Sequence, residues 1–249
     1  MTSSLDVARA PRISAVCFDI DDTLIDFTGN ARTALESVIG RTDRWSCWEQ
    51  LTDRHVARVV SGEICYDTMR RDRMRDLFVD LGLLLDDELL DGIEQRRMNR
   101  MRANWRLFDD ALPCLEWMHA AGLKVAAVTN ASGAHQRVKI AEAGLERFFD
   151  AVVIAGELGV AKPDPAIFHT ACAVLGVPVE RTLHIGDRLD LDAHGARDAG
   201  LHGVWLSRIA DVDLGWADVG VPVVRTLADL PELLVSDFVT TGMPVQRCR

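Results

Sequence analysis

Short apolar segments alternate with helical stretches through the second half of this 249-residue chain, and this alternation constrains the fold more than any other feature. Strands that alternate with helices are typical of a parallel sheet covered by helices on both faces. Four helical stretches end in the same signal, a glycine followed by an apolar residue, which favours a Schellman turn. The predicted strands are Lys124–Thr129, Ala151–Ile154, Thr182–Ile185 and Gly203–Leu206, and the stop glycines are Gly122, Gly144, Gly176 and Gly200.

A further strand is predicted near the N-terminus, where the apolar run from Ile13 to Ile20 leads into three acids, Asp19, Asp21 and Asp22. Ligands bind at the carboxyl ends of the strands in sheets of this kind. An extended backbone would direct Asp19 and Asp21 to the same side, and crowded carboxylates raise each other's pKa. A hard cation such as Mg²⁺ would relieve that repulsion. The alternative interpretation is an acidic turn in which Asp22 or Thr23 caps a helix.

About a hundred residues separate this strand from the next, far more than a βαβ crossover needs. Apolar side chains in this stretch recur at three- and four-residue steps, which predicts amphipathic helices over residues 45–59, 66–81 and 89–105. Gly62 and the Gly82 region are the expected breaks between them. The stretch contains no convincing strand, so we expect a helical insertion in the sheet domain.

Charge also distinguishes the insertion. Residues 27–107 contain 14 arginines, no lysine and 14 acids, so the remaining residues account for the whole net charge of -10. We therefore predict an α/β core domain of residues 1–26 and 108–249, interrupted by a helical cap domain of residues 27–107. Because the insertion leaves directly after the acidic cluster, we expect the cap to lie over the carboxyl edge of the sheet.

Composition excludes several classes of function. No apolar run approaches the roughly 20 residues that span a bilayer, and residues 1–12 lack the pattern of a signal peptide, so we expect a cytoplasmic protein without a membrane partner. The negative net charge argues against binding of a nucleic-acid polymer. The six cysteines form no C-x-x-C pair, which indicates reduced thiols rather than zinc ligands or disulfides. Either a monomer or a homodimer is compatible with the sequence.

Polar side chains follow three more of the predicted strands. Thr129 and Asn130 could hold an anion through a hydroxyl and backbone N–H groups, although both are also common turn residues. Lys162, in a chain with only three lysines against 25 arginines, lies in a loop stiffened by prolines on its carboxyl side. Acids follow the strand that ends at Ile185, and a helix N-terminus alone would explain their presence. These acids are Asp187, Asp190 and Asp192.

The joint pattern is more specific than any of its members. In chain order, Asp19-Ile20-Asp21-Asp22-Thr23-Leu24, Thr129, Lys162 and Gly186-Asp187 through Asp192 resemble the four motifs of the haloacid dehalogenase-like (HAD) hydrolase superfamily. The helical insertion is similar to the cap of subfamily I members, such as small-molecule phosphatases, nucleotidases and 2-haloacid dehalogenases. The resemblance implies an α/β fold with a Rossmann-like parallel sheet, helices on both faces and an inserted all-helical cap domain.

The resemblance also implies roles for the motif residues. Asp19 would attack phosphorus to form an aspartyl-phosphate, and Asp21 would protonate the leaving oxygen and then deprotonate water. Mg²⁺ would be held by the Asp19 carboxylate, the Asp21 backbone carbonyl and the Asp187 carboxylate. The phosphoryl group would be bound by Thr129, Asn130 and Lys162, and Asp192 would orient Lys162 or a metal-bound water. We interpret Asp190 as helix N-terminal charge.

Asp21 separates the branches of the superfamily, because dehalogenases that attack carbon typically lack this second aspartate. The sequence therefore favours a Mg²⁺-dependent phosphatase acting on a small phosphomonoester, such as a sugar phosphate, a nucleoside monophosphate or a short phospho-acid. The alternatives are a phosphomutase or 2-haloacid dehalogenase of the same superfamily, or a non-catalytic regulator that carries phospho-aspartate. Asp22 departs from the glycine that is commoner in the family motif, which leaves the substrate subgroup open.

Arginines of the predicted cap are candidates for binding a phosphate or carboxylate of the small phosphorylated metabolite that we expect as the partner. Most of them could equally be solvated residues on helix surfaces. They are Arg70, Arg71, Arg73, Arg96, Arg97 and Arg100.

Overall fold

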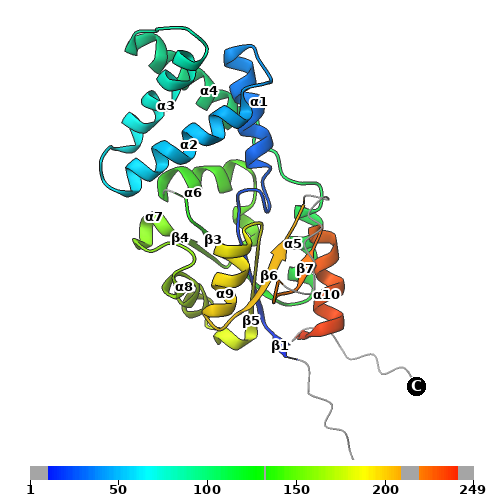
Figure 1. Ribbon diagram of the computed structural model, residues 1–249. Coiled ribbons are helices and arrows are strands. Elements are labelled where there is room, and N and C mark those ends of the chain that lie inside the picture. The colour runs from blue at the N-terminus through cyan, green and yellow to red at the C-terminus, as the bar shows by residue number, and fades with distance from the viewer. Residues whose placement is uncertain (1–10, 132, 209–218, 241–249) are drawn as a thin grey trace, which may run out of the picture. The chain divides into compact units, whose positions relative to one another are not determined.

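The computed structural model describes residues 11–131, 133–208 and 219–240 of the chain (Figure 1). Its internal contacts divide the chain into two compact units. Residues 1–26 and 106–249 form the α/β unit, and residues 27–105 form the helical unit. The helical unit thus ends two residues before the end of the predicted insertion at residue 107. Its role as a cap stays a prediction.

A six-stranded sheet in the order β4-β3-β2-β5-β6-β7 forms the centre of the α/β unit, and every pair of neighbouring strands is parallel. All four residues of β2 are fully buried, as expected for a strand with helices on both faces. The predicted Rossmann-like parallel sheet is confirmed. Its strands are β2 (Ala15–Phe18), β3 (Lys124–Thr129), β4 (Ala151–Ile154), β5 (Thr182–Gly186), β6 (His202–Leu206) and β7 (Val223–Val224).

The first predicted strand differs from the structure. Ile13 belongs to β1 (Arg12–Ile13), which pairs in parallel with β8 (Val239–Thr240) in a separate two-stranded sheet. Ser14 interrupts the run, and its N–H donates to the Arg181 carbonyl at 2.9 Å. β2 then ends at Phe18, directly before Asp19.

Helices cover both faces of the sheet (Figure 1). On one face, α8 and α9 pack on Ala15 and Cys17 of β2 and on Ala126 and Val128 of β3. On the other face, α5 packs on β3 and against α10. The helices of the α/β unit are α5 (Ala111–Ala120), α6 (Gly133–Glu142), α7 (Ala155–Leu158), α8 (Pro165–Leu175), α9 (Gly195–Asp198) and α10 (Leu230–Asp237), with a π-helix, η3, at Leu189–His194 and 3₁₀ turns at Glu146–Phe148 (η1), Val179–Arg181 (η2) and Leu227–Asp229 (η5).

The predicted stop glycines end four helical segments as expected. At the end of α5, the Gly122 N–H donates to His119 and the Leu123 N–H donates to Met118, which is the paired bond pattern of the Schellman motif. The same two bonds recur at the other three stops. All four glycines have the left-handed backbone that this turn requires, with φ values of 68° at Gly122, 67° at Gly144, 64° at Gly176 and 89° at Gly200.

The two segments that join the units lie side by side within the α/β unit. Ile25 and Leu107 form an antiparallel bridge. The Asp26 N–H donates to the Arg106 carbonyl at 2.9 Å, and the Phe108 N–H donates to the Leu24 carbonyl at 3.0 Å. The chain therefore leaves and returns at neighbouring points.

Four helices make up the helical unit: α1 (Phe27–Ile39), α2 (Trp45–Val60), α3 (Tyr66–Asp80) and α4 (Asp87–Ala103). The last three correspond to the predicted helices. Gly62 and Gly82 lie in the turns between them, with φ values of 75° and 76°. The sequence did not predict α1, because its buried face consists of Asn30, Ala31, Ala34 and Leu35 and so lacks a strong apolar stripe. The core of the unit contains Leu35, Trp48, Leu51, Met74, Leu77, Phe78, Leu90 and Ile93.

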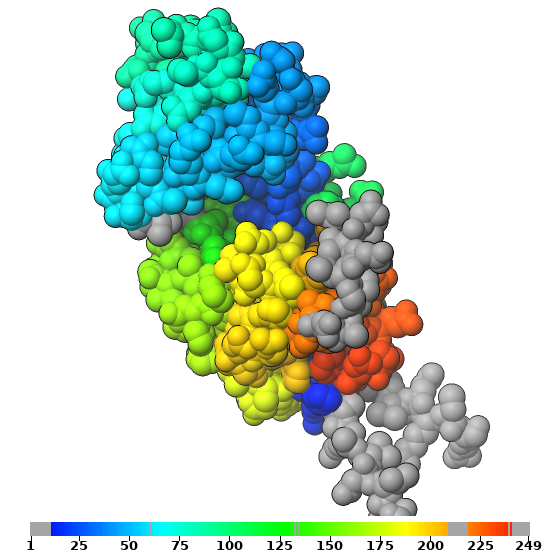
Figure 2. All heavy atoms as spheres, viewed as in Figure 1, coloured from blue at the N-terminus to red at the C-terminus, as the bar shows by residue number. Residues whose placement is uncertain are grey.

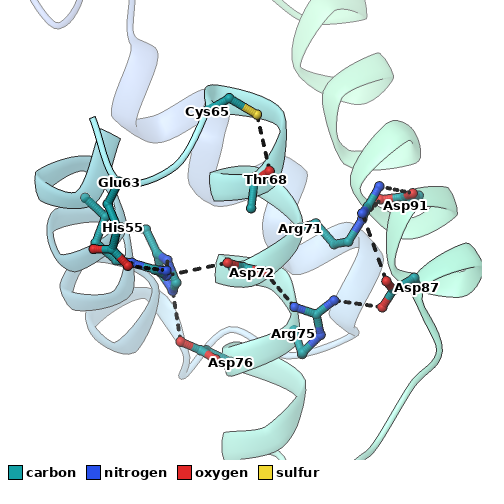
Figure 3. A network of polar contacts seen from close by, with 11 residues as sticks. His55, Glu63, Cys65, Thr68, Arg71, Asp72, Arg75, Asp76, Asp87 and Asp91 are labelled. Atoms are coloured by element: carbon teal, nitrogen blue, oxygen red, sulfur yellow. Dashed lines mark hydrogen bonds and ion pairs between the residues drawn. The ribbon is translucent and has the colours of Figure 1, made fainter. Parts of the chain in front are cut away.

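A polar network joins α2, α3 and α4 (Figure 3). Arg71 donates to both oxygens of Asp91 at 2.7 Å, and Arg75 donates to Asp72 at 2.6 Å and to Asp87 at 2.7 Å. Because these side chains are partly or largely exposed, solvent screening leaves each pair only a small net contribution to stability. The network thus pairs some of the arginines of this unit with some of its acids.

Two of the arginines are buried. Arg97 donates to both oxygens of Glu94 at 2.7 Å, while Arg73 donates to Glu94 at 3.4 Å and lies 3.9 Å from the Trp48 ring centroid. Burial lowers the pKa of Arg73 to about 10, and the nearby charge of Arg97 acts in the same direction. Arg71, Arg73 and Arg97 therefore already have acidic partners inside the helical unit.

In the part of the chain that the structure describes, no helix has both the length and the apolar character needed to cross a membrane. Cys248 lies outside the described residues, and the other five cysteines are free thiols.

Replacing Gly203 by alanine should destabilise the sheet, because an added Cβ would lie 1.9 Å from the Ala193 carbonyl oxygen. The clash is with backbone, which cannot move aside as a flexible side chain can. We expect a loss of about 3 kcal/mol in the free energy of unfolding, measured by urea titration. The matched control is Gly92→Ala in α4, where the nearest atom is an Arg96 guanidinium nitrogen at 3.7 Å. This control should gain up to about 1 kcal/mol, so a Gly203→Ala protein as stable as Gly92→Ala would contradict the packing described here.

Candidate active site

The predicted site residues from different parts of the chain meet at the carboxyl edge of the sheet. β3, β2 and β5 are neighbours, so the ends of these strands bring Thr129, Asp19 and Asp187 together. The Asp19 N–H continues the pairing of β2 with β5 by donating to the Ile185 carbonyl at 2.9 Å. Lys162 comes from the loop between α7 and α8 and contacts Asp19 directly.

A tight turn after β2 sends Asp19 and Asp21 to different partners. Asp22 adopts φ 61°, and its N–H donates to the Ile25 carbonyl at 2.7 Å. Aspartate tolerates this left-handed backbone, which glycine would also adopt readily. No helix follows directly, since α1 begins at Phe27, so the alternative of a cap by Asp22 or Thr23 is wrong. Thr23 instead accepts the Asp187 N–H at 3.2 Å.

Lys162 has a full set of acceptors for its ammonium group. Its Nζ lies 2.6 Å from Asp19 Oδ1, 2.7 Å from Asp192 Oδ1 and 2.9 Å from the Val128 carbonyl oxygen. An ammonium has three N–H donors, and these three oxygens use all of them. A direct contact from Lys162 to a phosphoryl group would therefore need one of these bonds to be exchanged.

One ammonium cannot neutralise two buried carboxylates equally. Burial raises the pKa of Asp19 to about 7, and Lys162 opposes this shift without cancelling it. Burial would also raise the pKa of Asp192, but Lys162 and His184 together hold it well below its usual range. Burial alone would lower the pKa of Lys162, which the two carboxylates keep above its usual range. Of the two carboxylates that Lys162 contacts, Asp192 is therefore the permanent anion and Asp19 is the one closer to neutrality.

The sequence did not predict the role of His184. Its Nε2 lies 2.9 Å from Asp192 Oδ1, and burial lowers its pKa, so the neutral ring donates this bond. Asp192 also accepts the Arg188 N–H at 3.1 Å and packs so closely on Gly186 that an added Cβ there would lie 2.2 Å from the Asp192 Cγ. The only sign of this role in the sequence is that a histidine lies inside the apolar strand β5.

Helix α6 provides two further residues that the sequence did not predict. The Lys139 ammonium forms an ion pair with Asp21, and the Gln136 amide donates to Thr129 Oγ1 at 3.2 Å. Both side chains are buried. Lys139 carried the same signal as Lys162, a rare lysine in an arginine-rich chain, whereas nothing in the sequence distinguished Gln136.

The side chain of Asn130 binds the backbone of Lys162. Its Nδ2 donates to the Lys162 carbonyl at 3.0 Å, and its Oδ1 accepts the Lys162 N–H at 2.7 Å. The pair fixes the loop that carries the lysine. A phosphate contact from Asn130 would thus have to come from its backbone N–H or from the second hydrogen of Nδ2.

Asp187 and Asp190 lie in different environments. Burial raises the pKa of Asp187 to about 8, and the neighbouring charges of Asp19 and Asp192 act in the same direction. Asp190 is exposed and pairs with Arg188 at 3.3 Å, as expected for surface charge. It lies in η3, part of the segment after β5 that is coloured yellow in Figure 2 and reaches the surface of the α/β unit.

The acidic cluster has the chemistry of a divalent cation site. One carboxylate oxygen each from Asp19, Asp187 and Asp192 lies within 4.8 Å of the others. Lys162, His184 and the Arg188 N–H already occupy Asp192, while no cation of the described residues contacts the Asp187 carboxylate. Asp19 and Asp187 thus offer crowded oxygen donors that the single ammonium of Lys162 does not neutralise, and such donors fit a hard ion such as Mg²⁺. Asp19 and Asp187 are the side chains best placed to hold it.

Comparisons with known proteins agree with this geometry. A family model described as haloacid dehalogenase-like hydrolase matches residues 13–200. The glyceraldehyde 3-phosphate phosphatase of Methanopyrus kandleri is 31% identical over 197 residues, which are 79% of this chain and 84% of that protein. The N-acylneuraminate-9-phosphatase of Mus musculus is 28% identical over 255 residues, covering 94% of this chain and 98% of that protein.

A solved structure shows the same fold. The HAD-hydrolase YfnB from Bacillus subtilis, determined with bound magnesium, superposes with a TM-score of 0.73. The superposition covers 90% of this chain and 99% of that chain at 23% sequence identity.

Without divalent cations, the stability of the protein should fall as pH rises from about 4 to about 8. The pKa values of Asp19 and Asp187, about 7 and about 8, lie above those of the unfolded chain, so between these limits the unfolded state releases protons that the folded state retains. We expect a loss of about 2 kcal/mol over this range, measured by urea unfolding in EDTA. Asp187→Asn should flatten the profile. An unchanged slope in this variant would contradict the assignment.

Proposed function

Because this chain belongs to the haloacid dehalogenase-like hydrolase family, we propose that it is a Mg²⁺-dependent phosphatase that hydrolyses a small phosphomonoester through an aspartyl-phosphate on Asp19. The observation that carries the proposal is the pair of aspartates held by separate lysines. Asp19 contacts Lys162 and Asp21 contacts Lys139. A nucleophile and a proton carrier thus lie at one edge of the sheet with independent support.

Each residue of the site has a separate task in the proposed reaction. A carboxylate oxygen of Asp19 attacks phosphorus, and the bond to the leaving oxygen breaks as Asp21 donates a proton to it. Asp21 then takes a proton from the water that attacks phosphorus, and the bond between phosphorus and the Asp19 oxygen breaks to release inorganic phosphate. Thr129 donates a hydrogen bond to the phosphoryl group. Lys162 holds Asp19 in place and offsets part of its negative charge as a phosphate dianion approaches.

The cation would occupy the acidic cluster. Asp19 and Asp187 would hold Mg²⁺ through carboxylate oxygens, and Asp21 would contribute its backbone carbonyl. When bound, the ion supplies positive charge to the phosphoryl oxygens and lowers the repulsion between substrate and carboxylates.

The group that leaves phosphorus indicates which class of substrate the site suits. Glyceraldehyde 3-phosphate and N-acylneuraminate 9-phosphate, which the names of the two relatives specify, are both phosphate esters of primary alcohols. An alkoxide is a poor leaving group and needs a proton, which is the task of Asp21. A dehalogenase would release halide without such a proton. We therefore favour a primary-alcohol phosphate of a small metabolite over a haloacid as the substrate. The cytoplasmic location and the monomeric or homodimeric state remain predictions.

Asp19→Asn should lower phosphate release from a panel of phosphomonoesters at least about 10³-fold, because the amide cannot act as the nucleophile. Phosphate release is measured at saturating Mg²⁺, and EDTA should abolish it in the unmodified protein. The matched control is Asp190→Asn, which removes an exposed carboxylate from the same acidic region and should keep full activity. An active Asp19→Asn protein would refute the assigned nucleophile.

A further inference from the structure

The side chain of Gln136 is buried on α6 at 2% exposure, one helical turn before Lys139. Its Nε2 lies 3.2 Å from Thr129 Oγ1, and this contact joins α6 to the end of β3. A buried amide that points at a candidate phosphate-binding hydroxyl has a consequence for the direction of that hydroxyl proton.

The hydrogen bonds of Thr129 can be counted. A hydroxyl has two acceptor lone pairs and one donor proton. The Gln136 amide and the Ala131 N–H, at 3.2 Å and 3.4 Å, both donate to Thr129 Oγ1 and so use the acceptor positions. Among the described residues, none accepts the Thr129 proton. The Thr129 hydroxyl can then form a hydrogen bond to a bound substrate only as the donor.

We infer that Gln136 is a positioning residue that orients the Thr129 hydroxyl so that its proton is directed at the phosphoryl group of the substrate. The inference rests on the proposed phosphatase function. Without the amide, the hydroxyl could rotate and present a lone pair to an anion, which is repulsive. With it, the donor direction is set before substrate arrives, as is characteristic of preorganised sites.

Two substitutions separate orientation from packing. Gln136→Met keeps the length of the side chain but removes the donor, and should lower kcat/KM for p-nitrophenyl phosphate about tenfold, the worth of one oriented hydrogen bond. Gln136→Glu keeps the shape but offers only acceptors when ionised, so it would draw the Thr129 proton toward itself and cause a larger loss. The matched control is Arg137→Met, on the exposed side of the same helix, which should retain the activity of the unmodified protein.

A double-mutant cycle with Thr129→Val gives the decisive measurement. If Gln136 acts through the hydroxyl, Gln136→Met should cost less than twofold in the Thr129→Val background. The affinity for inorganic phosphate in the presence of Mg²⁺, measured by calorimetry, should follow the same pattern and does not require turnover. Gln136→Glu, which preserves the shape of the side chain, supplies the comparison if Gln136→Met is poorly folded.

Three results would overturn the inference. An equal loss from Gln136→Met in both backgrounds would indicate a packing role, and Gln136→Glu with undiminished activity would indicate that the amide oxygen faces Thr129. If the unmodified protein releases no phosphate, the proposed function and this inference fail together. If it is active but either of the first two results is found, only the role of Gln136 fails.

Discussion

The ammonium of Lys162 between Asp19 and Asp192 is the interaction on which the site depends. Two carboxylates and one ammonium at such low exposure leave an excess of negative charge, which is costly in an interior of low polarity. Removing the lysine would leave two like charges without compensation. The Asn130 side chain and the Val128 carbonyl fix the lysine, so the charge state of Asp19, the proposed nucleophile, depends on a residue 143 positions later in the chain.

Much of the sheet could be predicted because its strands are short, apolar and bounded by glycine stops. β3 and β4 agree with prediction residue for residue, and β5 and β6 differ by one residue each. β7 has two residues and carries no pattern of its own. The break between β1 and β2 follows from pairing with β8, a partner more than two hundred residues away that no local pattern reveals.

The candidate site divides in the same way. Residues at strand ends were predictable because parallel topology gathers them at one edge. Gln136 and Lys139 were missed because they lie on a helix with an ordinary surface pattern, and His184 was missed because it lies inside an apolar strand. The Lys139 contact with Asp21 spans 118 positions, a pairing that only the packing of α6 can establish. The motifs thus point to the candidate reacting groups but not to the buried side chains that contact them.

The paired connections at Ile25 and Leu107 have a consequence for how such a protein can diversify. Because the chain departs and comes back through hydrogen-bonded neighbours, the ends of the insertion are held together by bonds that lie within the α/β unit itself. The bonds between the two connecting segments then offset the entropic cost of closing this long loop, so the contacts of the candidate site do not have to. An insertion of another length or shape would meet the same two anchor points, so the inserted unit could be exchanged while the sheet edge that carries the candidate site stays unchanged.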